Sequence, residues 1–219
     1  GKLGLTTDVL DCGPARPMSG KAAKELTENR QKPQAVHNAC SGKHSGMLAL
    51  CRMLGVAVEG YTKPAHEVQQ IMHKAVAMAA DVPSDQLEIG IDGCGVPVFY
   101  LPLYNMALAY ARLAVPEKGV WGEYEPAVRT IRDAMSGYPE IVAGTGRIDT
   151  IVSNITQGRI IAKIGANAVY CLCAKDKGIG VAFKIEDGSY GAINPAVIGV
   201  LKRLQLVNEE EYAQLIEKF

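Results

Sequence analysis

Two short segments of this sequence each place a cysteine beside glycine and a charged side chain, in turns where core packing requires no such group. They are Cys-Ser-Gly-Lys-His at 40–44 and Ile-Asp-Gly-Cys-Gly at 91–95. Cys40 and Lys43 lie three residues apart before an apolar helical run at 47–54. This spacing puts both side chains on one side of a first helical turn, where unpaired N–H groups and the positive helix end favour a thiolate. The two segments together indicate a chemical site.

The second segment adds a carboxylate, because Asp92 lies two residues before Cys94 in a turn flanked by glycines. Zinc accepts two thiolates in a tetrahedral site, so Cys40 and Cys94 are candidate ligands. From the residues alone an equally good interpretation exists. Both cysteines can be small buried residues at tight turns, with Lys43 in solvent.

Length, charge and cysteine content narrow the class of protein. A chain of 219 residues that is 48% hydrophobic can bury one large core or two small ones. Lys plus Arg and Asp plus Glu number 23 each, so no basic surplus favours a nucleic-acid or acidic-membrane partner. No apolar run approaches the roughly 20 residues of a membrane-spanning helix. The six cysteines are too sparse for a disulfide scaffold and, with no signal-peptide pattern at the amino terminus, indicate a cytoplasmic protein with free or metal-bound thiols.

The elements that position these segments are mainly helices, followed late in the chain by strands. Apolar periodicity and start or stop signals predict helices at 21–29 after a Ser19 cap, at 64–80, 103–114, 126–135 and 195–204, and at the carboxyl terminus. Short β-rich runs at 159–164, 168–174 and 178–185 predict an antiparallel meander. Three strands form a thin sheet beside this much helix. Either the sheet is small or further strands lie outside this chain.

Three more segments complete a pattern of five blocks. The blocks are Asp-Cys-Gly-Pro at 11–14, His-Asn-Ala-Cys-Ser-Gly-Lys-His-Ser-Gly-Met at 37–47, Ile-Asp-Gly-Cys-Gly-Val-Pro at 91–97, Gly-Arg-Ile-Asp-Thr at 146–150 and Ala-Lys-Ile-Gly-Ala at 162–166. In this order they resemble the asparaginase II family, the rhizobial-type or class 3 L-asparaginases, over essentially the whole chain.

The resemblance implies a fold of the α/β (α+β) class. Its type is that of the serine β-lactamases and penicillin-binding proteins, an antiparallel sheet flanked by helices with a helical subdomain. We therefore expect a single domain over 1–219. Its mainly helical portion, 1–145, holds the metal-site cysteines, and 146–219 holds the meander and the C-terminal helices.

The resemblance also implies a zinc ion held by Cys40, Lys43 and Cys94, with water in the remaining position. Lysine binds a metal only as the neutral amine, so Lys43 needs a strongly lowered pKa from burial and from the metal itself. Two thiolates make zinc electron-rich and weaken it as a Lewis acid. We therefore expect the ion to shape and orient the substrate pocket more than to generate hydroxide.

The implied reaction is hydrolysis of L-asparagine to L-aspartate and ammonia. Lys163 matches the family's second active-site lysine and can stabilise negative charge in a tetrahedral intermediate. Asp92 is expected to act in catalysis and to bind the substrate's α-ammonium group. Arg147, at the substrate carboxylate, and His44 are the other expected substrate-binding residues. The residues leave other roles open. Lys163 can extend from an edge strand into solvent, Asp92 can cap its own turn, and Arg147 can form a surface ion pair with Asp149.

The family's nucleophile, a serine in a Ser-x-x-Lys motif, has no counterpart in this sequence. We expect that serine, together with the first strands of the sheet, to lie before Gly1. The chain alone is then inactive and needs a complementing N-terminal segment, and the family resemblance implies a homodimer. Two alternatives stay open: a catalytically incomplete zinc-binding remnant, and a thiol-dependent acyl hydrolase with Cys40 as nucleophile and Lys43 or His44 as base. Metal analysis separates the last from the other two.

Overall fold

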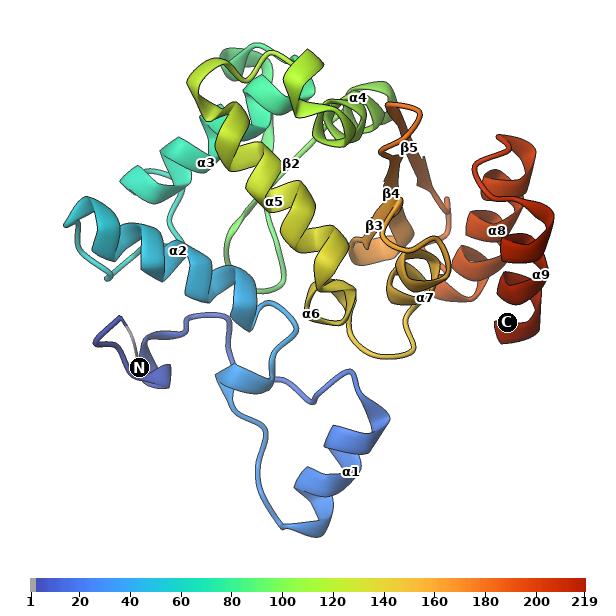
Figure 1. Ribbon diagram of the computed structural model, residues 1–219. Coiled ribbons are helices and arrows are strands. Elements are labelled where there is room, and N and C mark those ends of the chain that lie inside the picture. The colour runs from blue at the N-terminus through green and yellow to red at the C-terminus, as the bar shows by residue number, and fades with distance from the viewer. Residues whose placement is uncertain (1–2) are drawn as a thin grey trace. The chain divides into compact units, whose positions relative to one another are not determined.

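The computed structural model describes residues 3–219 (Figure 1). The chain divides into two compact units. The first comprises the chain up to Ala77 together with Pro83–Tyr100, and the second comprises Met78–Val82 and Leu101–Phe219. The described residues form nine α-helices and two small antiparallel sheets, so the mixed helix-and-sheet class is confirmed. The single domain predicted over 1–219 stays a prediction.

The first unit holds the two cysteine segments. Its elements are α1 (Gly20–Glu28), α2 (Ser41–Leu54), most of α3 (Glu67–Ala80), β1 (Ile89–Ile91) and β2 (Pro97–Phe99). The predicted Ser19 cap is confirmed, since its hydroxyl accepts a hydrogen bond from the Ala22 N–H at 3.3 Å. β1 and β2 form an antiparallel hairpin that the periodicity did not predict, with Ile91 opposite Pro97.

Helix α2 is anchored by its apolar side. Met47, Leu48 and Cys51 are buried in one cluster with Tyr61 and Val96. Gly55, with a φ of 69°, ends the helix in the left-handed conformation that glycine adopts without strain. This packing fixes the N-terminus of α2 in the same unit as the hairpin.

The second unit contains the predicted meander. Its elements are α4 (Leu103–Ala114), α5 (Glu125–Gly137), α6 (Pro139–Ala143), α7 (Ile148–Ile155), β3 (Ile160–Ile164), β4 (Val169–Ala174), β5 (Ile179–Lys184), α8 (Ile193–Arg203) and α9 (Glu209–Lys218). The strands pair antiparallel in the order β3-β4-β5, which confirms the predicted meander.

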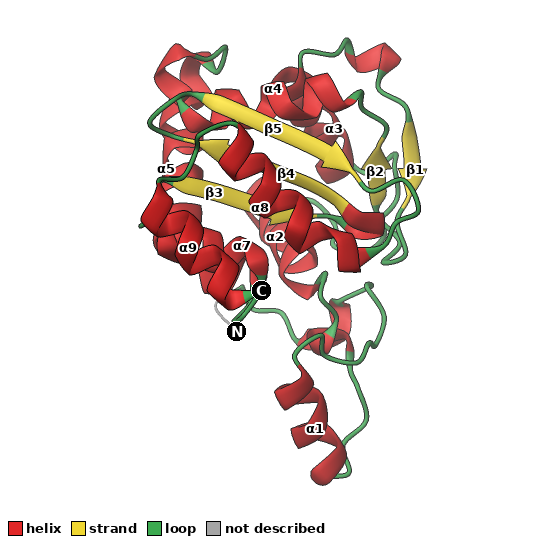
Figure 2. Cartoon of the chain, turned by 90° about the vertical axis from the view of Figure 1, so that its right-hand side faces the viewer, coloured by secondary structure: helices red, strands yellow, loops and turns green. Residues whose placement is uncertain are grey.

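The central strand β4 is buried on both faces. Leu172 joins one core cluster with Val197 of α8 and Leu215 of α9, while Cys173 packs with Ala114 of α4 in another. Figure 2 shows α8 lying across the strands. Of the nine helices in the described part of the chain, none is long and apolar enough to cross a bilayer.

Candidate metal centre

Cys40, Asp92 and Cys94 converge at the N-terminus of α2. Cys40 is the residue that precedes this helix, and the other two lie in the turn between β1 and β2. One ligand atom from each of the three lies within 4.8 Å of the others. The Cys94 thiol donates to Asp92 Oδ2 at 3.4 Å, and Lys43 Nζ lies 3.2 Å from the same oxygen. The structure thus brings together the three expected zinc ligands and the carboxylate expected beside them.

Hydrogen bonds to the backbone hold both segments in place. Asn38 Oδ1 accepts from the Cys40 N–H at 2.9 Å, and its amide group donates to the carbonyl of Cys12 at 2.8 Å. In the hairpin turn, Gly95 has a φ of 88° and its N–H donates to the Asp92 carbonyl at 2.9 Å. Asn38 was not identified from the sequence as a site residue, although it lies in the same block as Cys40.

Asp92 performs two tasks at once. Its Oδ1 accepts from the Gly93 N–H at 2.8 Å and stabilises the turn, while its Oδ2 faces Lys43 and Cys94. Burial raises the pKa of Asp92, but the bonds from Lys43, Cys94 and Gly93 outweigh it and the pKa is lowered. The capping role and the site role therefore do not exclude each other.

The charges of the cluster oppose the thiolate expected at Cys40. Burial raises the pKa of Cys40 and the neighbouring Cys94 raises it further, although the Lys43 charge partly opposes both. The pKa of Cys40 is therefore raised, in the direction opposite to the favoured thiolate expected from its position at a helix N-terminus. A cation at the cluster is the group that would ionise it.

The same cluster favours the charged form of Lys43. Burial lowers the pKa of Lys43, but the hydrogen bond to Asp92 and the electrostatic influence of the neighbouring Cys94, Cys40 and Asp92 outweigh burial, so the pKa is raised. Without a metal, Lys43 is the cation of the cluster. The neutral amine that a zinc ligand requires must therefore come from displacement by the metal itself.

The residues fit a zinc ion. Zinc binds sulfur at about 2.3 Å and nitrogen or oxygen at about 2.0–2.2 Å, so ligand atoms around one ion lie within about 4 Å of each other. The ligand atoms of Cys40, Asp92 and Cys94 lie within 4.8 Å of one another, which is close to this spacing. Cys94 is only 6% exposed, and both cysteines are free thiols. Two of the donor groups are thiols, and thiolates bind zinc in preference to harder cations such as magnesium.

His44 lies behind the cluster, fully buried against Tyr61. Its Nδ1 is 2.6 Å from the Tyr61 hydroxyl, which also accepts from the Asp11 N–H at 2.9 Å. Burial and the Lys43 charge lower the pKa of His44, and its Nε2 is buried without a hydrogen-bond partner. A neutral imidazole follows. Tyr61 was missed because no local pattern marks a tyrosine whose role arises only from tertiary contact.

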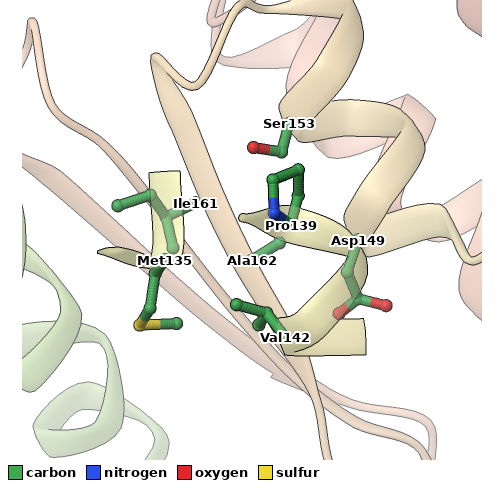
Figure 3. Close-up of a pocket in the computed structure, with 7 residues that line it drawn as sticks. All are labelled: Met135, Pro139, Val142, Asp149, Ser153, Ile161 and Ala162. Carbon is green, nitrogen blue, oxygen red and sulfur yellow. The ribbon is translucent and has the colours of Figure 1, made fainter. Parts of the chain in front are cut away.

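The other expected site residues belong to the second unit. Lys163 lies on β3 and its Nζ donates to the Ile164 carbonyl at 2.7 Å, and Arg147 immediately precedes α7. The sequence left open a surface ion pair between Arg147 and Asp149, and the burial of Asp149 rules that alternative out. Asp149 is 2% exposed on a helix, and neither of its carboxylate oxygens has a hydrogen-bond partner. Figure 3 shows it in a hollow with Ser153 of the same helix.

Helices around an antiparallel meander, with a cluster of thiols and a carboxylate at a helix N-terminus, define an α/β protein with a candidate zinc centre. The L-asparaginase II family matches residues 1–219, the whole chain, and the protein belongs to this family. No curated protein matches the chain. Membership points to L-asparaginase activity, the hydrolysis of an amide in a small-molecule substrate.

Proposed function

We propose that this protein is an L-asparaginase that works through a serine acyl-enzyme. The observation that carries the proposal is the family match over residues 1–219. The cluster of Cys40, Lys43, Asp92 and Cys94 supports it, because it offers a metal and a carboxylate for binding a small polar substrate.

We infer that the fold is of the serine-β-lactamase type. The meander β3–β5 with α8 and α9 against one face and α4 against the other supports this inference. In the complete enzyme, further strands would extend the sheet.

Cys40, Cys94 and Lys43 would hold the zinc ion. When bound, the ion supplies a fixed positive charge that orients polar groups of the substrate, since two thiolates limit its power to activate water. With Lys43 as a neutral zinc ligand, Asp92 Oδ2 would no longer face an ammonium group. Asp92 Oδ2 would then be available to accept a hydrogen bond from the α-ammonium group of asparagine.

The nucleophilic serine is supplied by a segment before Gly1. Its hydroxyl oxygen attacks the side-chain amide carbon, the amide nitrogen leaves as ammonia after taking up a proton, and water then hydrolyses the ester to aspartate. Lys163 provides positive charge for the tetrahedral intermediate.

A Ser–Lys contact does occur within the chain, but it is not arranged as a nucleophile. Lys175 Nζ donates to Ser136 Oγ at 2.5 Å, and the Ser136 hydroxyl donates to the Gly158 carbonyl at 2.5 Å. An activated serine gives its proton to a base, whereas this one gives it to the backbone. The contact ties α5 to the start of β3.

The two alternatives make different predictions. A thiol-dependent acyl hydrolase needs a reactive Cys40, and the raised pKa of this thiol argues against it. A zinc-binding remnant keeps the metal but shows no turnover even when the upstream segment is supplied.

Metal analysis and an asparaginase assay test the proposal together. We expect about one zinc per chain, negligible ammonia release by the 219-residue chain alone, and turnover when the upstream segment is joined to it. Turnover by the pure 219-residue chain would overturn the upstream nucleophile. No turnover by the extended protein would favour the remnant.

The family resemblance also leads us to propose a homodimer. Light scattering on the purified protein is expected to give twice the chain mass of 23.4 kDa. A monomeric mass at micromolar concentration would contradict it.

A further inference from the structure

The outer edge of β3 exposes one backbone unit to α7. Ile164 pairs with Tyr170 across the sheet, and the next residue, Gly165, donates its N–H to the Val169 carbonyl at 2.8 Å. Bonded and non-bonded pairs alternate in an antiparallel ladder, so the N–H and C=O of Ile164 both point away from β4. Because β3 is an edge strand of the three-stranded sheet, these groups need partners outside it.

Lys163 supplies one of those partners. Its side chain is exposed, and its Nζ donates to the Ile164 carbonyl at 2.7 Å. The ammonium group is therefore held along the strand edge.

Asp149 approaches the same backbone unit from α7. It lies in the first turn of the helix, where the positive helix end stabilises a carboxylate. Burial raises the pKa of Asp149, and its own backbone, the Lys163 charge, the Ile164 backbone and the Arg147 charge partly oppose the rise. Two cations and a strand amide thus face this buried carboxylate.

The other side chains that line the hollow around Asp149 include no charged group. The other groups of the hollow are Ser153, whose hydroxyl is also unpartnered, and the apolar side chains of Met135, Pro139, Val142, Ile161 and Ala162 (Figure 3). The hollow is too tight to hold a water molecule. Burying a carboxylate this deeply costs stability, and ionisable groups in such surroundings cluster at functional sites.

We propose that Asp149 is a positioning residue for Lys163. Its carboxylate lies at the amide side of the Ile164 backbone while the Lys163 ammonium binds the carbonyl side, so that the buried negative charge keeps the amine charged and fixed at the edge of β3. The proposal deepens the proposed function, and rests on it, because there Lys163 stabilises negative charge.

Selective acetylation of lysines tests this without any need for turnover. Only the neutral amine attacks acetic anhydride; acetate leaves and the proton passes to the buffer. Native protein at pH 8 is treated briefly, and mass spectrometry of peptides gives a rate constant for each lysine. We expect Asp149→Asn to raise the rate at Lys163 by about three- to tenfold, since loss of a nearby opposite charge favours the neutral amine.

Two controls isolate the charge. Lys184 is exposed at the end of β5, and its Nζ likewise donates to the carbonyl of the following residue, Ile185. Its rate is expected to stay the same in the variant. Ser153→Ala alters the same hollow and helix without removing a charge, and is expected to leave Lys163 unchanged.

Each outcome of the acetylation experiment either supports or overturns the proposal. A change below twofold at Lys163 in Asp149→Asn, or an equal rise in Ser153→Ala, overturns the proposal. Should Asp149→Asn fail to fold, the wild-type protein decides, because slower acetylation of Lys163 than of Lys184 supports the proposal and an equal or faster rate overturns it. Absence of asparagine hydrolysis in every preparation would overturn the proposed function and leave the acetylation result standing.

Discussion

Lys43 and Asp92 are joined by an ion pair of 3.2 Å across 49 positions of the chain. The pair links the first turn of α2 to the β1–β2 turn, and so brings Cys40 and Cys94 to the same place. Its side chains are 38% and 26% exposed, so the ion pair is partly open to solvent.

Asp92→Asn tests what this carboxylate does. The ion pair is partly exposed, so its loss is expected to cost less than about 1 kcal/mol of stability. Zinc affinity is expected to fall about tenfold, as for other groups that support metal ligands. Competition with a chromophoric chelator measures it, with Asp85→Asn, on the surface of the same unit, as control. Equal zinc affinity in both variants would contradict the role given to Asp92.

Tyr61→Phe tests the support behind the cluster. The change leaves His44 Nδ1 without its partner in buried surroundings and removes the acceptor of the partly buried Asp11 N–H. We expect a loss of about 1–3 kcal/mol in the free energy of unfolding, measured by urea titration. Tyr104→Phe is the matched control because Tyr104 is 74% exposed. A cost no greater than that of the control would show that the hydroxyl contributes nothing.

Gly180→Ala tests the packing of α4 on β5. A Cβ at Gly180 would lie 1.9 Å from the Ala107 carbonyl oxygen and 2.4 Å from the Ala111 nitrogen, both backbone atoms of α4. A loss of at least about 3 kcal/mol follows, because backbone must move. Gly199→Ala, in α8 with nothing near the new Cβ, is expected to gain about 0.5–1 kcal/mol. Similar melting temperatures for the two variants would refute this packing.

Buried thiols predict a loss of stability in alkali. Burial raises the pKa of Cys171 to about 11 and of Cys173 to about 12, from an ordinary value of 9.0. Above pH 9 the unfolded thiols lose protons that the folded ones keep, so unfolding is favoured as pH rises toward the folded values. Each thiol contributes up to about 1.4 kcal/mol per pH unit.

Urea unfolding under reducing conditions between pH 8 and 10.5 measures this slope. The double variant Cys171→Ala, Cys173→Ala is expected to show a smaller decline than the wild type. Identical slopes would mean that these thiols ionise in the folded state as they do in the unfolded chain.

The periodic helices and the meander were predictable because their signals are local. The helix predicted at 103–114 coincides with α4, and the three β-rich runs coincide with β3–β5. The β1–β2 hairpin has strands of three residues, too short for alternation to stand out. Helix α7 follows glycines and contains β-branched residues that favour strands, so it forms because Ile148 and Val152 bury against the sheet rather than by propensity.

The site was predictable to the extent that its chemistry is local. The spacing of Cys40 and Lys43 marked one segment of the site, and that of Asp92 and Cys94 marked the other. Only the family resemblance implied that the two segments bind one ion. The charges were not predictable, because the pKa of Lys43 depends on a carboxylate from a distant turn. The burial of Asp149 was equally hidden, since acidic residues in a first helical turn are usually exposed caps.

The zinc content of the purified, unchelated chain tests the central claim most directly. Elemental analysis is expected to find about one zinc per chain in the wild type and in Cys51→Ala, a buried α2 cysteine outside the cluster, and almost none in Cys40→Ser or Cys94→Ser. Folded wild-type protein that stays free of metal at micromolar zinc, or Cys40→Ser and Cys94→Ser variants that bind zinc as the wild type does, would contradict it.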